Sequence, residues 1–167
     1  KRIGRAMADI YMKIDGIKDE SEDDKHKDQI EVQSYSHSVD LPISNVVSSS
    51  GSATASRCVH SDFTIQKYMD ISTPTLNQYC SSGKPIKEIV MTLRRAGETQ
   101  QPYTIYTMTD CVVSNIAVSG GGSDLPMESV SFNYGKIVWE YKKLDRETGQ
   151  AKGDAVGNWN ARKNKID

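Results

Sequence analysis

Apolar and polar residues alternate with a period of two through most of this chain. Near the amino terminus, Ile10, Met12 and Ile14 alternate with more polar neighbours, which is typical of a strand with one buried face. Later stretches show the same strand-like composition: residues 30–39, 63–67, 89–94 and 103–118. The pattern therefore predicts a mainly β domain.

One segment predicts a helix instead of a strand. Ser72 or Thr73 can cap its start, and Pro74 suits the first helical position because its missing N–H has no partner there. Gly83 ends the segment, since glycine adopts the left-handed conformation of a helix end at little cost. The apolar stripe at helical spacing, which we assign to the core, consists of Leu76, Tyr79 and Cys80.

The last long apolar pattern changes parity at Gly135, from even positions over 130–134 to odd positions over 137–141. Such a change predicts a β-bulge or a barrel corner at the glycine. Strands this long and numerous are expected to curl and close. The tail from Leu144 is polar as far as Trp159, which we expect to anchor it. The predicted fold class is an antiparallel β-barrel with one short α-helix.

Composition removes several classes of function. The chain has 167 residues, 37% of them apolar, with 21 basic residues against 22 acidic ones. This balance lacks the positive excess of a nucleic-acid binder. No apolar run approaches the roughly 20 residues that span a bilayer, so we expect neither a nucleic-acid partner nor membrane insertion.

The two ends and the cysteines give weaker information. Residues 1–6 are basic and lack the apolar stretch of a signal peptide, so we interpret them as a tag remnant ahead of a native start at Met7. A single domain over residues 7–167 follows. Cys58, Cys80 and Cys111 are odd in number and far apart, which favours reduced thiols, although one disulfide plus one free thiol stays open.

No motif in the chain organises catalysis or metal binding. The three histidines, His26, His37 and His60, lack metal-ligand spacing, so we interpret them as surface or strand residues. The acidic stretch 19–24 lacks the order of a calcium loop and is expected to be a solvated turn. No G-x-S-x-G motif is present, and the glycines at 120–122 precede no phosphate-binding lysine. We therefore expect no enzyme activity, no metal and no cofactor.

Several segments together carry a resemblance that covers nearly the whole chain. They are D-I-Y-M-K-I-D-G at 9–16, D-F-T-I-Q-K-Y-M-D at 62–70, S-T-P at 72–74, C-S-S-G-K at 80–84, L-R-R-A-G at 93–97 and E-S-V-S-F-N-Y at 128–134. Their order and spacing resemble the haemolysin-coregulated proteins (Hcp), the tube subunits of bacterial type VI secretion. Asp19 and Ile71 depart from the residues usual in that family.

The resemblance implies a fold and an assembly. The family folds as a β-barrel with one helix, and six subunits form a ring. Rings stack into a hollow tube inside a contractile sheath, which expels the tube with its spike protein, VgrG. Family members are made in the cytoplasm, leave the cell without a cleaved signal peptide, and some hold small effector proteins in the lumen.

Two sets of site residues follow from this reading. The Ser-rich loop from Leu41 to Ser56 cannot pack a core, so we expect it to reach a neighbouring subunit or ring. The residues assigned to this ring or stacking contact are Leu41, Ser44, Asn45, Val46, Val47 and Gly51. The corresponding family segment borders the channel, so the residues assigned to the lumen are Ser36, His37 and Asp40.

Two other classes of function stay open at this point. A monomeric β-barrel that binds a ligand or peptide would show an exposed aromatic platform, whereas Trp139 and Trp159 both stand in patterned or anchoring contexts. A hydrolase would need an organised nucleophile, which the sequence does not display.

Overall fold

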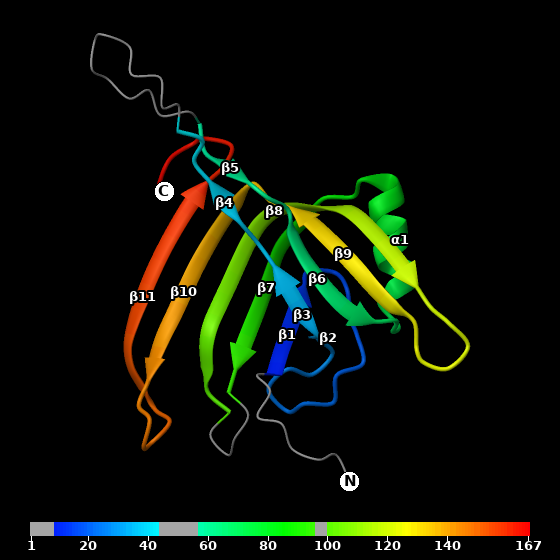
Figure 1. Cartoon of the computed structure of the whole chain (residues 1–167), viewed down its shortest axis with the longest axis horizontal. Helices are drawn as coiled ribbons and strands as arrows, with labels where there is room; N and C mark the ends of the chain where they lie inside the picture. The colour runs from blue at the N-terminus through cyan, green and yellow to red at the C-terminus, as the bar shows by residue number, and fades with distance from the viewer. Residues whose placement is uncertain (1–8, 44–56, 96–99) are drawn as a thin grey trace.

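The computed structural model describes residues 9–43, 57–95 and 100–167 and confirms the mainly β architecture with one helix (Figure 1). The first strands are short, and the later ones are long. In chain order the elements are β1 (Asp9–Ile14), β2 (Ile30–Val32), β3 (Ser34–Ser36), β4 (Val39–Asp40), β5 (Val59–His60), β6 (Phe63–Tyr68), α1 (Thr73–Ser82), β7 (Ile86–Arg94), β8 (Pro102–Ser119), β9 (Met127–Asn133), β10 (Lys136–Leu144) and β11 (Ala151–Asn160).

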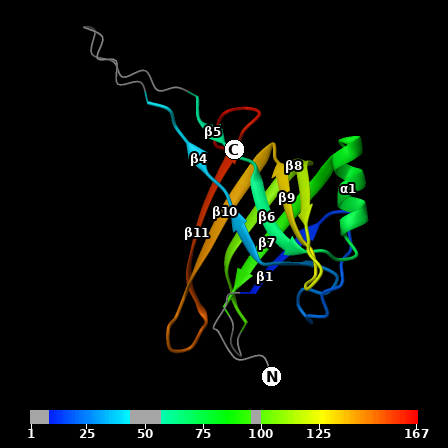
Figure 2. The ribbon, with the colours of Figure 1, turned by 45° about the vertical axis from the view of Figure 1, so that its right-hand side comes forward.

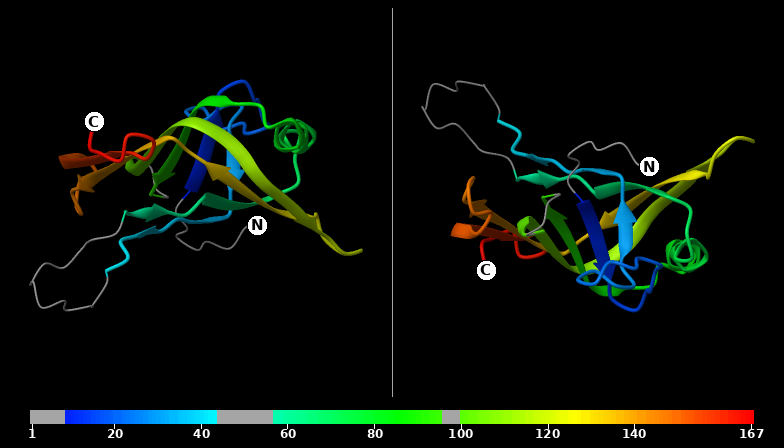
Figure 3. Two further views of the ribbon diagram at one scale, coloured as in Figure 1. Left: turned by 90° about the horizontal axis from the view of Figure 1, so that it is seen from above. Right: turned by 90° about the horizontal axis from the view of Figure 1, so that it is seen from below.

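The main sheet is antiparallel and follows the order β2-β1-β7-β8-β9-β6-β3. Strand β10 pairs with both β8 and β11, so a β10–β11 hairpin extends the sheet on one flank. Figure 3 shows the sheet strongly curled, with α1 lying beside it next to β8. Strands β4 and β5 form a separate two-stranded sheet.

The two ends of the curled sheet meet within one stretch of chain. Strand β2 pairs with β1, strand β3 pairs with β6, and only Gln33 separates β2 from β3. The Gln33 N–H donates to the Gln66 carbonyl at 2.8 Å. Because β2 and β3 follow one another along the chain, they cannot pair side by side, and the hydrogen-bonded sheet is an open path. The expectation that the strands close completely is wrong in this respect.

The corner predicted at Gly135 is present. Strands β9 and β10 both run along the same side of β8. Asn133 lies opposite Val112 and Lys136 lies opposite Thr109, so the register of the pairing is the same on both sides of the break. The Gly135 N–H donates to the carbonyl of Thr109 at 3.0 Å. A Cβ at Gly135 would lie 2.9 Å from Arg162 Nε and 3.1 Å from Asp110 Cβ, so the close approach of neighbouring residues requires glycine here.

Helix α1 matches its prediction except at its cap. Ser72 occupies the N-cap, but its hydroxyl donates to Asp70 instead of capping a helix N–H. Pro74 lies in the first turn, and Gly83 ends the helix with a φ of 65°. Leu76 is buried, and Tyr79 and Cys80 pack against the core, so the predicted stripe is confirmed.

The core forms where apolar residues of facing strands meet. Phe63 lies opposite Phe132 and Ile65 opposite Val130 in the β6–β9 ladder, and all four are fully buried. Met12 from β1 and Met91 from β7 continue this core. The three cysteine thiols are free, as expected, with Cys111 buried and the other two half-buried.

The polar tail is a strand, which the sequence did not predict. Residues 151–160 form β11 along β10, and most of their side chains are exposed on both faces, so no alternation marks them. Trp159 packs against the core and anchors the tail, as expected.

Two predictions fall outside the described residues. They are the remnant at 1–6 and most of the Ser-rich loop. Among the residues that are described, no helix is long and apolar enough to cross a membrane.

Candidate assembly site

The β4–β5 sheet forms an arm, which comprises residues 37–43 and 57–61 and leaves the barrel beside the end of β11 (Figures 1 and 2). Four apolar side chains on it face solvent: Val39 is 47% exposed, Leu41 52%, Ile43 64% and Val59 54%. Apolar groups gathered on a projecting element mark a contact surface more often than a free one. The arm is thus the first candidate for an interface.

Two histidines fix the root of the arm. The His60 ring stacks against both Trp139 and Trp159, with ring centroids 6.1 and 6.3 Å away. His60 Nδ1 forms a 2.7 Å hydrogen bond with the Tyr134 hydroxyl, and that hydroxyl lies 3.5 Å from His37 Nε2. Tyr134 therefore joins both strands of the arm to the corner of the barrel.

The same surroundings keep the two histidines neutral. Burial lowers the pKa of His60 below its ordinary 6.5. The pKa of His37 is lowered as well, first by burial and to a smaller extent by repulsion from His60. Packing at the root of the arm therefore depends on uncharged imidazole rings.

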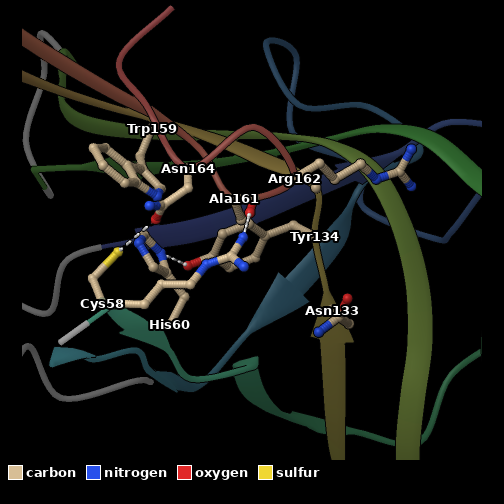
Figure 4. A pocket seen from close by; sticks show the side chains of 10 residues that line it. Cys58, His60, Asn133, Tyr134, Trp159, Ala161, Arg162 and Asn164 are labelled. Carbon is tan, nitrogen blue, oxygen red and sulfur yellow. Dashed lines mark hydrogen bonds between the residues drawn. The ribbon is translucent and has the colours of Figure 1, made fainter. Parts of the chain in front are cut away.

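A pocket of about 290 Å³ lies between the arm and the carboxy-terminal residues (Figure 4). Arg57 donates to the Ala161 carbonyl at 3.3 Å, and the Cys58 thiol donates to Asn164 at 3.8 Å. Arg162 points away from the pocket toward Asp110, 3.5 Å from its carboxylate. These contacts tie the arm to the end of β11 and the residues after it.

The predicted lumen residues are placed differently from one another. Ser36 lies on β3 opposite Thr64 and is exposed, as is Asp40 on the arm. His37 is half-buried and stacks against Phe63 and Trp139, which makes it part of the root of the arm. Of the predicted ring-contact residues, Leu41 is exposed on the arm, and Ser44, Asn45, Val46, Val47 and Gly51 lie outside the described residues.

The sequence analysis missed a buried charge cluster. Lys67 Nζ lies 2.8 Å from both Asp70 Oδ1 and Glu128 Oε2, and Thr73 donates to Glu128 at 3.0 Å. Asp19 completes the cluster beside Asp70, and these charged groups lie almost wholly inside. The sequence does contain a signal for this cluster. Lys67 shares the parity of the buried Phe63 and Ile65 along its strand, and Glu128 shares that of the buried Val130 and Phe132.

The acidic stretch is only in part the solvated turn expected, because Glu20, Glu22 and Asp24 are exposed and its other residues are not. Asp19 and Ser21 are buried, and Asp23 forms an ion pair with the buried Arg94. The hydrogen bond from Arg94 holds the pKa of Asp23 below its usual range. The Arg94 guanidinium also lies 4.8 Å from the centre of the Tyr11 ring. These charges pair across the fold, which a linear pattern does not reveal.

Comparison with known proteins places the chain. The model of the family described as "Type VI secretion system effector, Hcp" matches residues 11–141. Protein hcp1 of Pseudomonas aeruginosa is 32% identical over 158 residues, covering 93% of this chain and 96% of that protein. The Major exported protein of the same organism is 29% identical over 126 residues, covering 70% of this chain and 71% of the relative.

A solved structure agrees with these sequence matches. A structure described as that of a type six secretion system protein superposes with a TM-score of 0.88 at 28% identity, covering 96% of this chain and all of the other. The fold and these matches define a protein of the type VI secretion system. The chain belongs to the Hcp family. The matched family is described as a type VI secretion effector family, and one Pseudomonas relative is named as an exported protein.

Proposed function

We propose that six copies of this chain form a ring and that rings stack into the hollow inner tube of a type VI secretion system. Contraction of the surrounding sheath then expels the tube together with its VgrG spike. Membership in the Hcp family supports this role, because the matched relative covers nearly the whole chain.

The arm is the observation that carries the proposal. It exposes four apolar side chains away from the barrel's own core, so they do not stabilise a free-standing barrel. These residues are Val39, Leu41, Ile43 and Val59. A closed ring needs two different complementary surfaces on each subunit, and a projecting apolar arm supplies one of them. The adjoining residues up to Ser56 extend this contact to a neighbouring subunit or ring.

The charge balance suits repeated stacking. With 21 basic and 22 acidic residues, the net charge of each subunit is close to zero. Many rings can therefore stack with little overall repulsion.

The lumen and the export route complete the proposal. Exposed Ser36 and Asp40, with His37 behind them, contribute to the channel wall and meet small effector proteins there. The chain is made in the cytoplasm and leaves through the secretion system without a cleaved signal peptide. The name of the Pseudomonas relative, Major exported protein, supports export.

Negative-stain electron microscopy of the purified chain tests the assembly. Annular particles with six-fold symmetry, and stacks of them at higher concentration, are the expected images. Uniform single barrels would favour a monomeric ligand- or peptide-binding module instead.

A further inference from the structure

A second pocket, of about 250 Å³, lies over the buried charge cluster. Its walls come from the β1–β2 connection, β2, the β6–α1 connection and the residues before β9. Four carboxylates line it, and no basic side chain does: Asp19, Glu20, Glu31 and Asp70. The pocket therefore presents concentrated negative charge.

One carboxylate oxygen of Asp19 lacks a hydrogen-bond partner at this pocket, while the carboxyl group shares a hydrogen bond with Asp70. The residue is only 4% exposed, and its Oδ1 atom has no hydrogen-bond partner among the described residues. Its backbone N–H donates to the Asp28 carbonyl at 2.9 Å, which holds the residue in place. A buried carboxylate oxygen without a donor is costly, because burial removes the water that would otherwise bond it.

The cation already inside the cluster is committed elsewhere. Lys67 Nζ divides its hydrogen bonds among Asp70, Glu128 and the Tyr68 carbonyl, at 2.8, 2.8 and 3.2 Å. The cluster thus contains three carboxylates, those of Asp19, Asp70 and Glu128, and one ammonium group, that of Lys67. The cluster lacks a positive charge on the side that faces the pocket.

The rim of the pocket is apolar. Tyr68, Met69 and Leu125 line it and remain exposed. Lysine and arginine combine a long apolar stem with a cationic head, so they match an acidic floor below an apolar rim. Among the described residues, no group of three His, Cys, Asp or Glu side chains could hold a metal ion, which favours an organic cation.

We propose that this pocket binds a lysine or arginine side chain presented by a protein partner, with the cationic head on Asp19 and the stem against Tyr68, Met69 and Leu125. All the residues that line the pocket belong to one chain, so the proposal can be tested on a single subunit.

Proton competition gives the proposal a distinctive signature. Burial, together with the hydrogen bond shared with Asp70, raises the pKa of Asp19 to about 7. The other charged groups facing Asp19 are Lys67, Glu20 and Glu31. Because the cation must displace a proton from Asp19, binding is expected to tighten about tenfold between pH 6 and pH 8, the change in ionised fraction for a group of that pKa.

The test measures binding of the peptide acetyl-Gly-Arg-Gly-amide to the intact protein. Binding is detected by saturation-transfer NMR on the methylene protons of the arginine. The citrulline peptide has nearly the same shape without the charge and is the matched ligand. We expect the arginine peptide alone to bind, more tightly at pH 8 than at pH 6.

Variants locate the contact. Asp19→Asn should lose at least fivefold in affinity, whereas Asp24→Asn, an exposed acid of the same connection, should bind normally. Leu125→Lys changes an exposed residue, so it keeps the fold while its charge repels the peptide. Equal binding of the citrulline peptide, a pH-independent affinity or undiminished binding by Leu125→Lys overturns the proposal. Displacement of the peptide by millimolar Ca²⁺ also overturns it, in favour of a metal site.

Discussion

Lys67 and Glu128 face one another directly across the β6–β9 ladder, 2.8 Å apart from ammonium nitrogen to carboxylate oxygen, with both side chains fully buried. Each stands on the core-facing parity of its strand. A charged pair therefore occupies a position that an apolar pair would otherwise fill, next to the start of α1.

Lys67→Met should destabilise the protein by about 3–5 kcal/mol, because Glu128 and Asp70 would remain buried without their cation. Glu128→Gln should cost less, about 1–3 kcal/mol, since Asp70 still pairs with Lys67. Urea unfolding measures both free energies. The double variant Lys67→Met/Glu128→Gln should lose less than the sum of the two single losses, and additive losses would contradict the pairing.

The cluster also shows where sequence reasoning succeeds and where it stops. Parity at residues 63–67 and 130–134 predicted strands correctly, and Gly135 and Gly83 marked a corner and a helix end because their backbones have few alternatives. The partners of Lys67 and Arg94 come from distant segments, so no local pattern names them. Strand β11 escaped prediction because its exposed side chains carry no alternation, and its pairing with β10 is made by the backbone.

Gly135→Ala should destabilise the protein by about 1–3 kcal/mol, the usual cost of overpacking. The added methyl group would lie 3.1 Å from Asp110 Cβ, while the nearby Arg162 side chain can move aside. Thermal unfolding measures the change. Gly121→Ala is the control, because nothing lies within 4 Å of its added Cβ, and its stability should stay within about 0.5 kcal/mol.

Acid should loosen the root of the arm. The pKa values of His37 and His60 are lower in the folded state than the ordinary 6.5, so their contribution to stability is complete above pH 6.5 and is lost as pH falls below it. Each histidine adds at most about 1.4 kcal/mol per pH unit to this slope.

The measurement is the free energy of unfolding between pH 7 and pH 5. The variant His60→Gln should flatten its decline relative to the unchanged chain. His26→Gln serves as control because His26 stacks on Tyr11, away from the arm. A slope that His60→Gln leaves unaltered would contradict the role of the root.

Changes in the arm should weaken assembly and leave the barrel folded. Deletion of Asn45–Ala55 removes most of the Ser-rich loop, and Val59→Thr places a hydroxyl on the apolar surface of the arm. Light scattering should report smaller particles, while circular dichroism stays unchanged. Val118→Thr alters a valine 58% exposed on β8, compared with 54% for Val59, and should assemble normally. Full assembly by the deletion variant would refute the contact.

Ser36→Gln should reduce effector retention while rings still form, because a long side chain would replace a small exposed one on the proposed channel wall. Copurification of small proteins with the tube subunit measures retention, and Ser82→Gln, at an exposed serine of α1, is the comparison. If the Ser36→Gln variant retains effectors as well as the unchanged chain does, Ser36 does not line the lumen.

The proposal that this chain is a ring-forming tube subunit is tested most simply by mass. Size-exclusion chromatography with multi-angle light scattering, over a range of concentrations, measures the mass of the particle directly. A ring-forming subunit should give six times the mass of one chain, or multiples of that value where rings stack. A mass equal to one chain at every concentration would contradict it.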